Sequence, residues 1–355
     1  MNYILQIQKL LIKRDMLSSP SDRIALLKQA INLADAHNDV EWGFDLRLFL
    51  ILDEKDTPHC DESFPAFTWI LDTFDKHPDT FDESDFLWEY KWMIGSARRN
   101  CSISLNQVEA ITEDYKMRLE RNGFSLRPYY TVKAHLAMFL NNLDEARKYI
   151  DLRNQQIKDD MANCRACELD DDVELELRLG NFDKALAVGN DMLTKKITCG
   201  HMPFSAYCGC VKYFRQAGNM EKAYEYFLKA EEDLNNLEND TSLIAEVGEL
   251  VRFLTDYDKD KAWTFFEQYV HWNVNSDNYF DFLFSLSVLP LLKGETVRTL
   301  DVKPSLAWYR TDNIYNLQEI YDYYSDRAKD LAEKFDKRNG NSFFSEQFLE
   351  VVKQL

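Results

Sequence analysis

The residues of this chain whose types and spacing could do chemistry are two thiols in a C-x-x-C, Cys164 and Cys167, followed by Cys199 and His201 in the segment TCGHMP. A C-x-x-C has the short spacing of a metal-binding knuckle, and three cysteines with one histidine form a recognised tetrahedral zinc set. In such a set the ion staples two segments of chain together. The sequence therefore predicts one structural zinc ion on these four side chains.

Two other interpretations of the same cysteines stay open. They could be ordinary reduced thiols, because cysteine is small and easily buried. They could also be a redox pair in which the start of a helix lowers the pKa of Cys167, although a third thiol and the lack of a strand-helix-strand pattern count against this. The other thiols are expected within a helix or at turns on the opposite edge, and are left out of the site: Cys60, Cys101, Cys208 and Cys210.

No catalytic motif accompanies these residues. The chain has no G-x-S-x-G, no G-x-x-x-x-G-K-[ST] and no H-E-x-x-H, and its six histidines lie singly. The acidic run from Glu168 to Glu176 is interpreted as the solvated face of a helix. We therefore expect a protein that is not an enzyme.

A second candidate site is an aromatic and basic surface for a partner. In FLWEYKWMIGSARRN, residues 86–100, one helix face carries aromatic and basic side chains at spacings of three and four. Large aromatic and basic residues often anchor interfaces. The hypothesis is a lip that grips a protein or peptide, and the alternative is that both tryptophans are core between repeats. The lip consists of Trp88, Lys91, Trp92, Tyr129, Tyr130 and Lys133.

Helices must position these residues, because one pattern recurs along the chain. FLNNLDEARKYI, LRLGNFDKALAV and FRQAGNMEKAYEYF each join an apolar helix end to a turn rich in Asn or Gly, and then to a small residue. A small side chain there lets the second helix of a hairpin pack close to the first. The small residues recur every 38 to 42 positions, at Ala25, Ala66, Val108, Ala146, Ala185, Ala223 and Ala262. Such a period is typical of stacked helical hairpins.

The predicted fold is all-α, an α-α superhelix (solenoid) of about seven to eight helical hairpins with a C-terminal capping helix and no sheet. Residues 1–293 form the repeats, 294–312 an irregular connection, and 313–355 the capping helix and tail. The C-x-x-C and the Cys199 segment begin consecutive first helices, which lie side by side in such a stack. Helices are expected near 2–16, 21–37, 41–53, 62–76, 83–99, 105–121, 127–140, 143–157, 166–179, 182–196, 203–216, 220–236, 240–255, 259–272, 275–293 and 313–338.

Five segments spread over nearly the whole chain carry a resemblance to a known class. They are ADAHNDVEWGFDLRL (34–48), LWEYKWMIG (87–95), CRACELD (164–170), TCGHMP (198–203) and AEKFDKRNGNSFF (332–344). On these segments the chain resembles a group of bacterial proteins of tetratricopeptide-repeat type. Tetratricopeptide repeats run about 34 residues, so the helices here are longer than the norm of that class. The resemblance implies a helical-repeat fold. It gives no expectation about a biochemical activity.

Charge limits the partners. The chain has 42 basic and 61 acidic residues, a formal charge of −19. Such a field repels phosphate backbones and anionic lipid head groups, so neither nucleic acid nor a membrane is expected as a partner. An odd number of cysteines and the lack of a secretory signal favour a reducing, cytoplasmic location.

Together these features favour a non-catalytic helical-repeat scaffold that binds a protein or peptide in its concave groove. The basis is fold-level analogy together with the missing catalytic motifs. Two alternatives are a peptide-sensing regulatory adaptor, and a thiol redox or metal-dependent protein centred on Cys164 and Cys167.

Overall fold

The computed structural model describes residues 2–237, 240–294 and 296–355, and its regular structure is almost entirely α-helical, as predicted. The α-helices are α1 (Tyr3–Asp15), α2 (Pro20–Ala36), α3 (Val40–Glu54), α4 (Ser63–Lys76), α5 (Ser84–Arg99), α6 (Leu105–Arg121), α7 (Arg127–Phe139), α8 (Leu143–Gln155), α9 (Arg165–Arg178), α10 (Phe182–Val188), α11 (Asn190–Leu193), α12 (Phe204–Gln216), α13 (Met220–Leu234), α14 (Ile244–Tyr257), α15 (Lys259–Tyr269), α16 (Asn278–Leu292), α17 (Leu317–Asn339) and α18 (Phe343–Lys353). The remaining elements are the 3-10 helices η1 (Thr241–Leu243) and η2 (Val270–Asn273) and the strands β1 (Val297–Thr299) and β2 (Ile314–Asn316).

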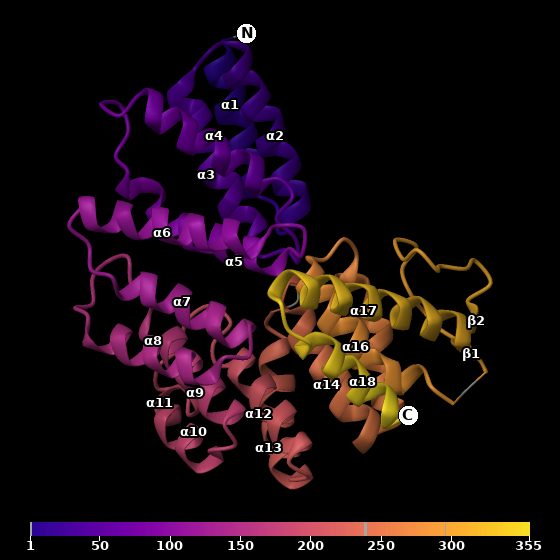
Figure 1. Ribbon diagram of the computed structural model, residues 1–355. Coiled ribbons are helices and arrows are strands. Elements are labelled where there is room, and N and C mark those ends of the chain that lie inside the picture. Colours follow the sequence, from indigo (N-terminus) through magenta and orange to yellow (C-terminus); the bar gives the residue numbers. More distant parts are fainter. Residues whose placement is uncertain (1, 238–239, 295) are drawn as a thin grey trace.

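Most helices pack against their neighbours in the sequence. α7 packs on α8, α9 on α10, α12 on α13 and α14 on α15. The first helix of a pair also contacts the first helix of the next, as α9 with α12, α12 with α14 and α14 with α16. Figure 1 shows the pairs following a curved path from α1–α4 to the C-terminal helices.

Small residues are buried in the second helices of the central pairs, as the period predicts. In the first pair the prediction is wrong, because Ala25 is exposed and α2 buries Ala30 and Ala34 instead. The turns also follow the prediction, since Gly180 and Gly218 have φ of 75° and 76°, which glycine adopts without strain. Four alanines of the series are completely buried, namely Ala146, Ala185, Ala223 and Ala262.

The helix expected at 182–196 is interrupted at Gly189, which separates α10 from α11. A Cβ atom at this position would lie 2.4 Å from a methyl carbon of Val173 on α9. The chain therefore approaches α9 more closely here than any larger residue allows.

The connection between α16 and α17 contains a small sheet, so the expectation of a fold without strands is wrong. β1 and β2 pair antiparallel, with Arg298 opposite Tyr315. Tyr315 is buried against Trp308, with ring centroids 5.4 Å apart. This aromatic contact anchors the connection, and α17 begins at Leu317 rather than at 313.

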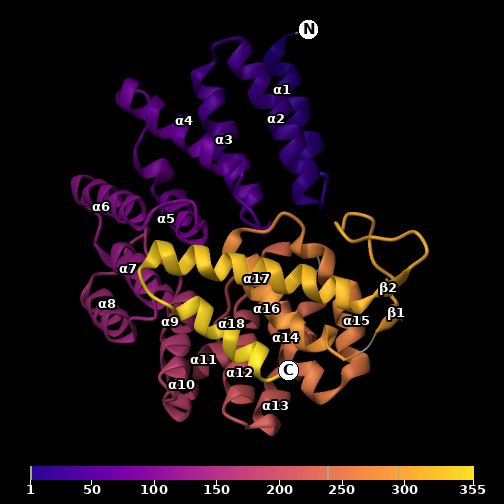
Figure 2. The same cartoon turned by 45° about the vertical axis from the view of Figure 1, so that its right-hand side comes forward.

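The C-terminal helices fold back over earlier parts of the chain. α17 packs along α16, as expected of a cap, and ends at Gly340 with φ of 70°. α18 contacts both α16 and α17. Its Phe344 is completely buried, with its ring centroid 5.2 Å from that of Phe139 on α7. Figure 2 shows α17 and α18 lying across the inner side of the curve.

Two large apolar cores hold the chain together, one mainly within α1–α7 and the other from α7 to the C-terminus. Asp277 connects the two parts: its carboxylate accepts a hydrogen bond from Arg99 Nε at 2.9 Å, and its N–H donates to the carbonyl of Pro58 at 2.6 Å. In the described ranges, no helix is both long and apolar enough to cross a membrane.

Candidate metal centre and its charged surroundings

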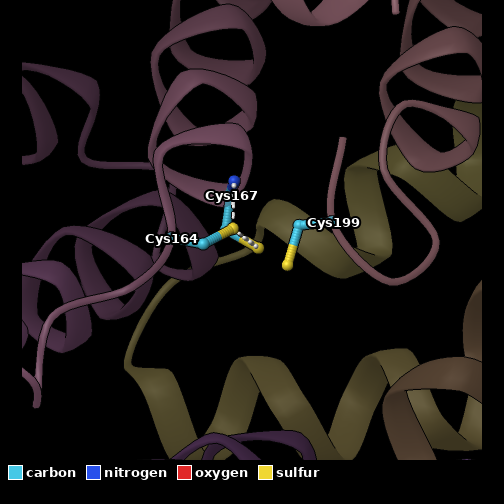
Figure 3. A group of neighbouring side chains, drawn as sticks. All are labelled: Cys164, Cys167 and Cys199. Carbon is cyan, nitrogen blue, oxygen red and sulfur yellow. Dashed lines mark hydrogen bonds between the residues drawn. The ribbon is translucent and has the colours of Figure 1, made fainter. Parts of the chain in front are cut away.

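Three cysteine side chains converge at the start of α9. Cys164 is the N-cap residue of this helix, and its sulfur accepts a hydrogen bond from the N–H of Cys167 at 3.4 Å. The sulfurs of Cys164 and Cys167 are 3.4 Å apart, and the sulfur of Cys199 completes a group whose members all lie within 4.8 Å of one another. Figure 3 shows Cys199 reaching this group from the neighbouring loop that leads to α12.

The turn that carries Cys199 directs the side chain of His201 towards Asp240 and away from the three thiols. Cys199 and Met202 form an isolated bridge, closed by the N–H of Met202 donating to the carbonyl of Cys199 at 2.7 Å, and Gly200 between them has φ of 51°. His201 Nδ1 lies 3.7 Å from a carboxylate oxygen of Asp240. The structure therefore brings together three of the four predicted ligands, and His201 is outside the group.

Three thiols suit zinc as a donor set. Sulfurs that share one tetrahedral zinc at ~2.3 Å are about 3.8 Å apart. The sulfurs of Cys164 and Cys167, 3.4 Å apart, are slightly closer than this value, and no two of the three sulfurs are more than 4.8 Å apart, so small side-chain rotations would bring all three into range. Cys199 is exposed, and the fourth ligand of a tetrahedral site would have to come from outside these three thiols.

The pKa values of the three thiols differ. Burial acts to raise the pKa of Cys164, but hydrogen bonds from the N–H of Cys167 and from the thiols of Cys199 and Cys167 lower it overall. Burial and the sulfur of Cys164 raise the pKa of Cys167. The expectation that the start of the helix lowers the pKa of Cys167 is therefore wrong. The backbone N–H groups at the N-terminus of α9 lower the pKa of the N-cap residue, Cys164, instead.

Lys91 is buried next to this group rather than on a contact surface. Its ammonium donates to the carbonyl of Met161 and to the side chain of Asn163, both at 2.9 Å, and lies 3.2 Å from the ring centre of Trp88. Burial lowers the pKa of Lys91 to about 7, against the opposing charge of Cys167. Lys91 thus fixes the segment that leads into Cys164.

The other residues of the predicted lip are largely packed. Tyr129 is buried and its hydroxyl donates to Glu113 at 2.7 Å. The rings of Tyr130 and Tyr149 stack with centroids 6.4 Å apart, and the ammonium of Lys133 lies 5.5 Å from the ring centre of Tyr149. Trp88 and Trp92 are half-buried and meet edge to face. Of the six residues, Lys91 and Tyr129 are thus buried and the other four are half-buried.

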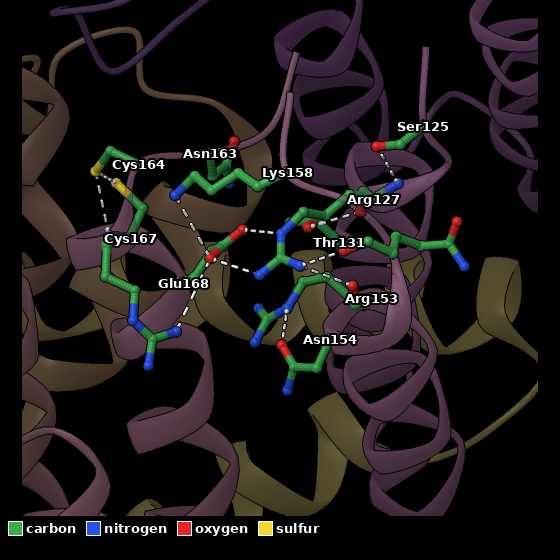
Figure 4. A network of polar contacts seen from close by, with 12 residues as sticks. Ser125, Arg127, Thr131, Arg153, Asn154, Lys158, Asn163, Cys164, Cys167 and Glu168 are labelled. Carbon is green, nitrogen blue, oxygen red and sulfur yellow. Dashed lines mark hydrogen bonds and ion pairs between the residues drawn. The ribbon is translucent and has the colours of Figure 1, made fainter. Parts of the chain in front are cut away.

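The acidic run on α9 is buried, so its interpretation as a solvated face is wrong. Glu168 is fully buried and accepts hydrogen bonds from Nε and Nη2 of Arg127, at 2.6 and 2.9 Å. Arg153, also fully buried, binds Asp171 at 2.9 Å and Asp172 at 2.6 Å. Figure 4 shows Glu168 facing Arg127 directly behind the C-x-x-C.

These interior cations are what sequence reasoning missed. The available signal was that Arg127 and Arg153 stand on α7 and α8, which precede the acidic helix α9 in the stack.

A scan of the chain against protein-family models finds no match, and a search of the curated proteins finds no relative. The geometry of the three thiols is thus the main evidence for chemistry at this site.

Proposed function

We propose that this chain is a non-catalytic helical-repeat scaffold in which one zinc ion joins two consecutive hairpins through Cys164, Cys167 and Cys199. The observation that carries the proposal is the convergence of three sulfurs from two segments that are separated by 32 residues. Because α9 contacts α12, an ion at this point fixes the α9–α10 pair against the α12–α13 pair. The superhelical class is supported by the 38–39-residue period of the buried alanines.

The scaffold is proposed to bind a protein or peptide in the cytoplasm. Stacked hairpins offer an extended surface, and the charge of −19 favours a neutral or basic partner. α17 and α18 lie across the inner side of the curve, which shortens the part of that face that a peptide can reach. The part of the inner surface that these helices leave open is therefore where partner contacts are expected.

The metal content of purified protein tests the zinc proposal. Protein isolated without chelator is expected to contain about one zinc per chain, and Co²⁺ exchanged into it is expected to show the intense thiolate-to-metal charge-transfer band of a site with three sulfurs. Cys164→Ser removes one ligand and is expected to abolish stoichiometric binding. Cys101→Ser is the matched control, because Cys101 is half-buried and lies outside the group. Protein without metal, with cobalt spectra equal in both variants, would end the proposal.

One observation favours the redox alternative, namely the 3.4 Å separation of the Cys164 and Cys167 sulfurs. A functional dithiol is expected to lose two titratable thiols reversibly under mild oxidation, with Cys199 still open to alkylation. A zinc site is expected to protect all three thiols from alkylation until a chelator is added. Mass spectrometry of alkylated protein separates the two outcomes.

A further inference from the structure

A cavity of about 260 Å³ lies among the first helices of the stack, further along α9 from the C-x-x-C. Helices α5, α7, α9, α12, α14 and α16 all contribute to its wall, so it occupies the centre of the curved arrangement. Both apolar and charged side chains line it. The residues that carry the argument are Arg98, Phe139, Asp170, Glu246 and Tyr279.

Arg98 is the cationic group of this cavity. Within the described ranges, its guanidinium has no carboxylate partner, and its Nε is buried without any acceptor. Burial and the charges of Arg99 and Arg338 lower the pKa of Arg98 to about 10, against the opposing effects of Tyr279 and Asp171. Arg98 as a whole is half-buried, but a guanidinium whose Nε is buried without an acceptor is costly, and a carboxylate is the group that satisfies it best.

Two carboxylates form the anionic part. In the part of the chain that the structure describes, Asp170 has no ion-pair partner. Glu246 accepts a long hydrogen bond from the Ser205 hydroxyl at 3.5 Å through Oε1, while its Oε2 is buried without a donor. Burial raises the pKa of both groups, and the charge of His201 offsets this in part. The imidazole of His201 is itself held at Asp240. A ligand cation would therefore relieve both carboxylates.

The other charged residues of the wall are already satisfied. Asp171 binds Arg153 and lies 2.6 Å from His135 Nε2. Glu174 accepts a hydrogen bond from the hydroxyl of Tyr213 at 3.1 Å and lies 3.9 Å from Arg178. Among the described residues of the wall, the charged groups without an ion-pair partner are thus the Arg98 guanidinium and the carboxylates of Asp170 and Glu246.

We propose that this cavity binds a free basic amino acid, with its carboxylate on Arg98 and its ammonium groups on Asp170 and Glu246. Two unpaired carboxylates against one guanidinium match a ligand that carries two cations and one anion. The cavity is close to the lower end of the usual range for small-molecule sites, which suits a ligand of amino-acid size. The ring of Phe139 in the wall packs against Arg98, with its centroid 5.6 Å from the guanidinium carbon, and Leu177 and Val173 add apolar side chains to the lining near which a methylene chain could lie. This site is separate from the thiol group and does not depend on metal.

Calorimetric titration of the whole chain with four probes tests the site. L-lysine is expected to bind, and three analogues are expected to bind at least about tenfold more weakly, because each lost charge-assisted contact contributes about 1.5–3 kcal/mol. Norleucine lacks the side-chain cation, cadaverine lacks the carboxylate, and glutamate carries the wrong charge. Absence of heat with lysine at millimolar concentration, or equal affinity for lysine and norleucine, would overturn the proposal.

Variants assign the contacts. Arg98→Met is expected to weaken lysine at least about tenfold while leaving cadaverine unchanged, because only lysine has a carboxylate. Glu246→Gln is expected to weaken both, and Glu109→Gln, at an exposed position, is expected to change neither. Circular dichroism identifies a variant that fails to fold. If a variant does not fold, the proposal is tested by the affinities of the unaltered chain for the four probes. If folded Arg98→Met and folded Glu246→Gln both bind lysine as tightly as the unaltered chain does, the assignment is wrong.

Discussion

At the residue scale, Lys91 connects two regions that the sequence treats as separate sites. It stands in the aromatic stretch, yet its ammonium is bonded to Met161 and Asn163, directly before Cys164. Groups that hold ligand-bearing segments in place tune a metal site almost as strongly as the ligands do. Lys91 is therefore a positioning residue for the proposed metal.

Replacing Lys91 tests this role. Lys91→Met keeps the length of the side chain but removes both hydrogen bonds, so zinc affinity is expected to fall about 10–100-fold while helix content is retained. Competition with a chelating dye measures the affinity. Lys133→Met, on α7 with its ammonium near Tyr149, is the matched control and is expected to bind zinc like the unaltered chain. Equal affinity in both variants would show that Lys91 does not support the site.

The candidate site could be predicted in part because spacing determines it. C-x-x-C placed two sulfurs on one helix start, and the period brought Cys199 to the neighbouring helix start. His201 could not be assigned, because the local turn at Gly200 decides which side chain faces the thiols. The direction of Lys91 also depends on tertiary packing rather than on the helical stripe that it shares with Trp88 and Trp92.

Gly189 offers a second residue-scale prediction, about packing. Gly189→Ala brings a methyl group to 2.4 Å from Val173, so the free energy of unfolding is expected to fall by about 1–3 kcal/mol. Gly95→Ala is the control, because the nearest atom there is 3.7 Å away on the flexible side chain of Arg99. In helix α5 this control is expected to be neutral or to stabilise by up to about 1 kcal/mol. Urea unfolding compares the two, and equal midpoints would refute the close contact.

At the scale of elements, helix α9 carries buried acidic side chains that form ion pairs with the neighbouring helices α7 and α8. Glu168 faces Arg127, while Asp171 and Asp172 face Arg153. The boundaries of α1–α9 and α12–α17 were predictable to within four residues from the period and turns, whereas the break at Gly189 and the helix α18 were not predicted. Burial of the acidic run was not, because neighbours on both sides of α9 remove it from solvent, and an isolated helix pattern cannot show them.

Removing Arg153, which pairs with both Asp171 and Asp172, is expected to lower the stability of the fold strongly. Arg153→Met leaves the carboxylates of Asp171 and Asp172 buried beside an apolar side chain, so stability is expected to fall by about 3–5 kcal/mol. Adding Asp172→Asn to this variant removes one stranded charge and is expected to restore part of the loss. Lys334→Met, which breaks the exposed pair with Asp330, is expected to change stability by less than about 1 kcal/mol. Chemical denaturation measures all three, and similar effects of the two single changes would contradict the network.

Element η2 carries a pH-sensitive contact with the connection before α17. His271 Nε2 lies 2.9 Å from the ammonium of Lys303, and burial together with Lys303 lowers the pKa of His271 to about 4. The unfolded chain has a histidine pKa of about 6.5, so it binds more protons between these values. The stability contributed by neutral His271 is complete above about pH 6.5 and is lost as the pH falls towards 4.

His271→Gln is therefore expected to flatten the decline of stability between pH 6.5 and pH 4. Thermal unfolding at several pH values gives the comparison. His77→Gln changes an exposed histidine and is expected to keep the slope of the unaltered chain. A slope that is the same in all three proteins would rule out His271 as the source.

At the scale of the whole molecule, the two apolar cores are joined by a small set of polar contacts. The main chain near the end of α5 accepts hydrogen bonds from Arg338 on α17, at 2.8 Å to the carbonyl of Arg98 and 3.0 Å to that of Asn100. These contacts join residues more than 230 positions apart in the sequence, so no local sequence pattern predicts them. They keep the C-terminal helices against the first half of the chain.

Arg338→Met is expected to loosen this closure without unfolding either core. Two lost charge-assisted hydrogen bonds contribute about 1.5–3 kcal/mol each, so amide exchange at the end of α5 and in α18 is expected to accelerate at least about tenfold. Exchange within α1 and α2 is expected to stay unchanged, because those helices pack in the other core. Arg310→Met is the matched control, since its guanidinium pairs with Asp312 two residues away. Hydrogen-exchange mass spectrometry resolves these segments, and if α18 exchanges equally slowly in both variants, Arg338 does not hold the two halves together.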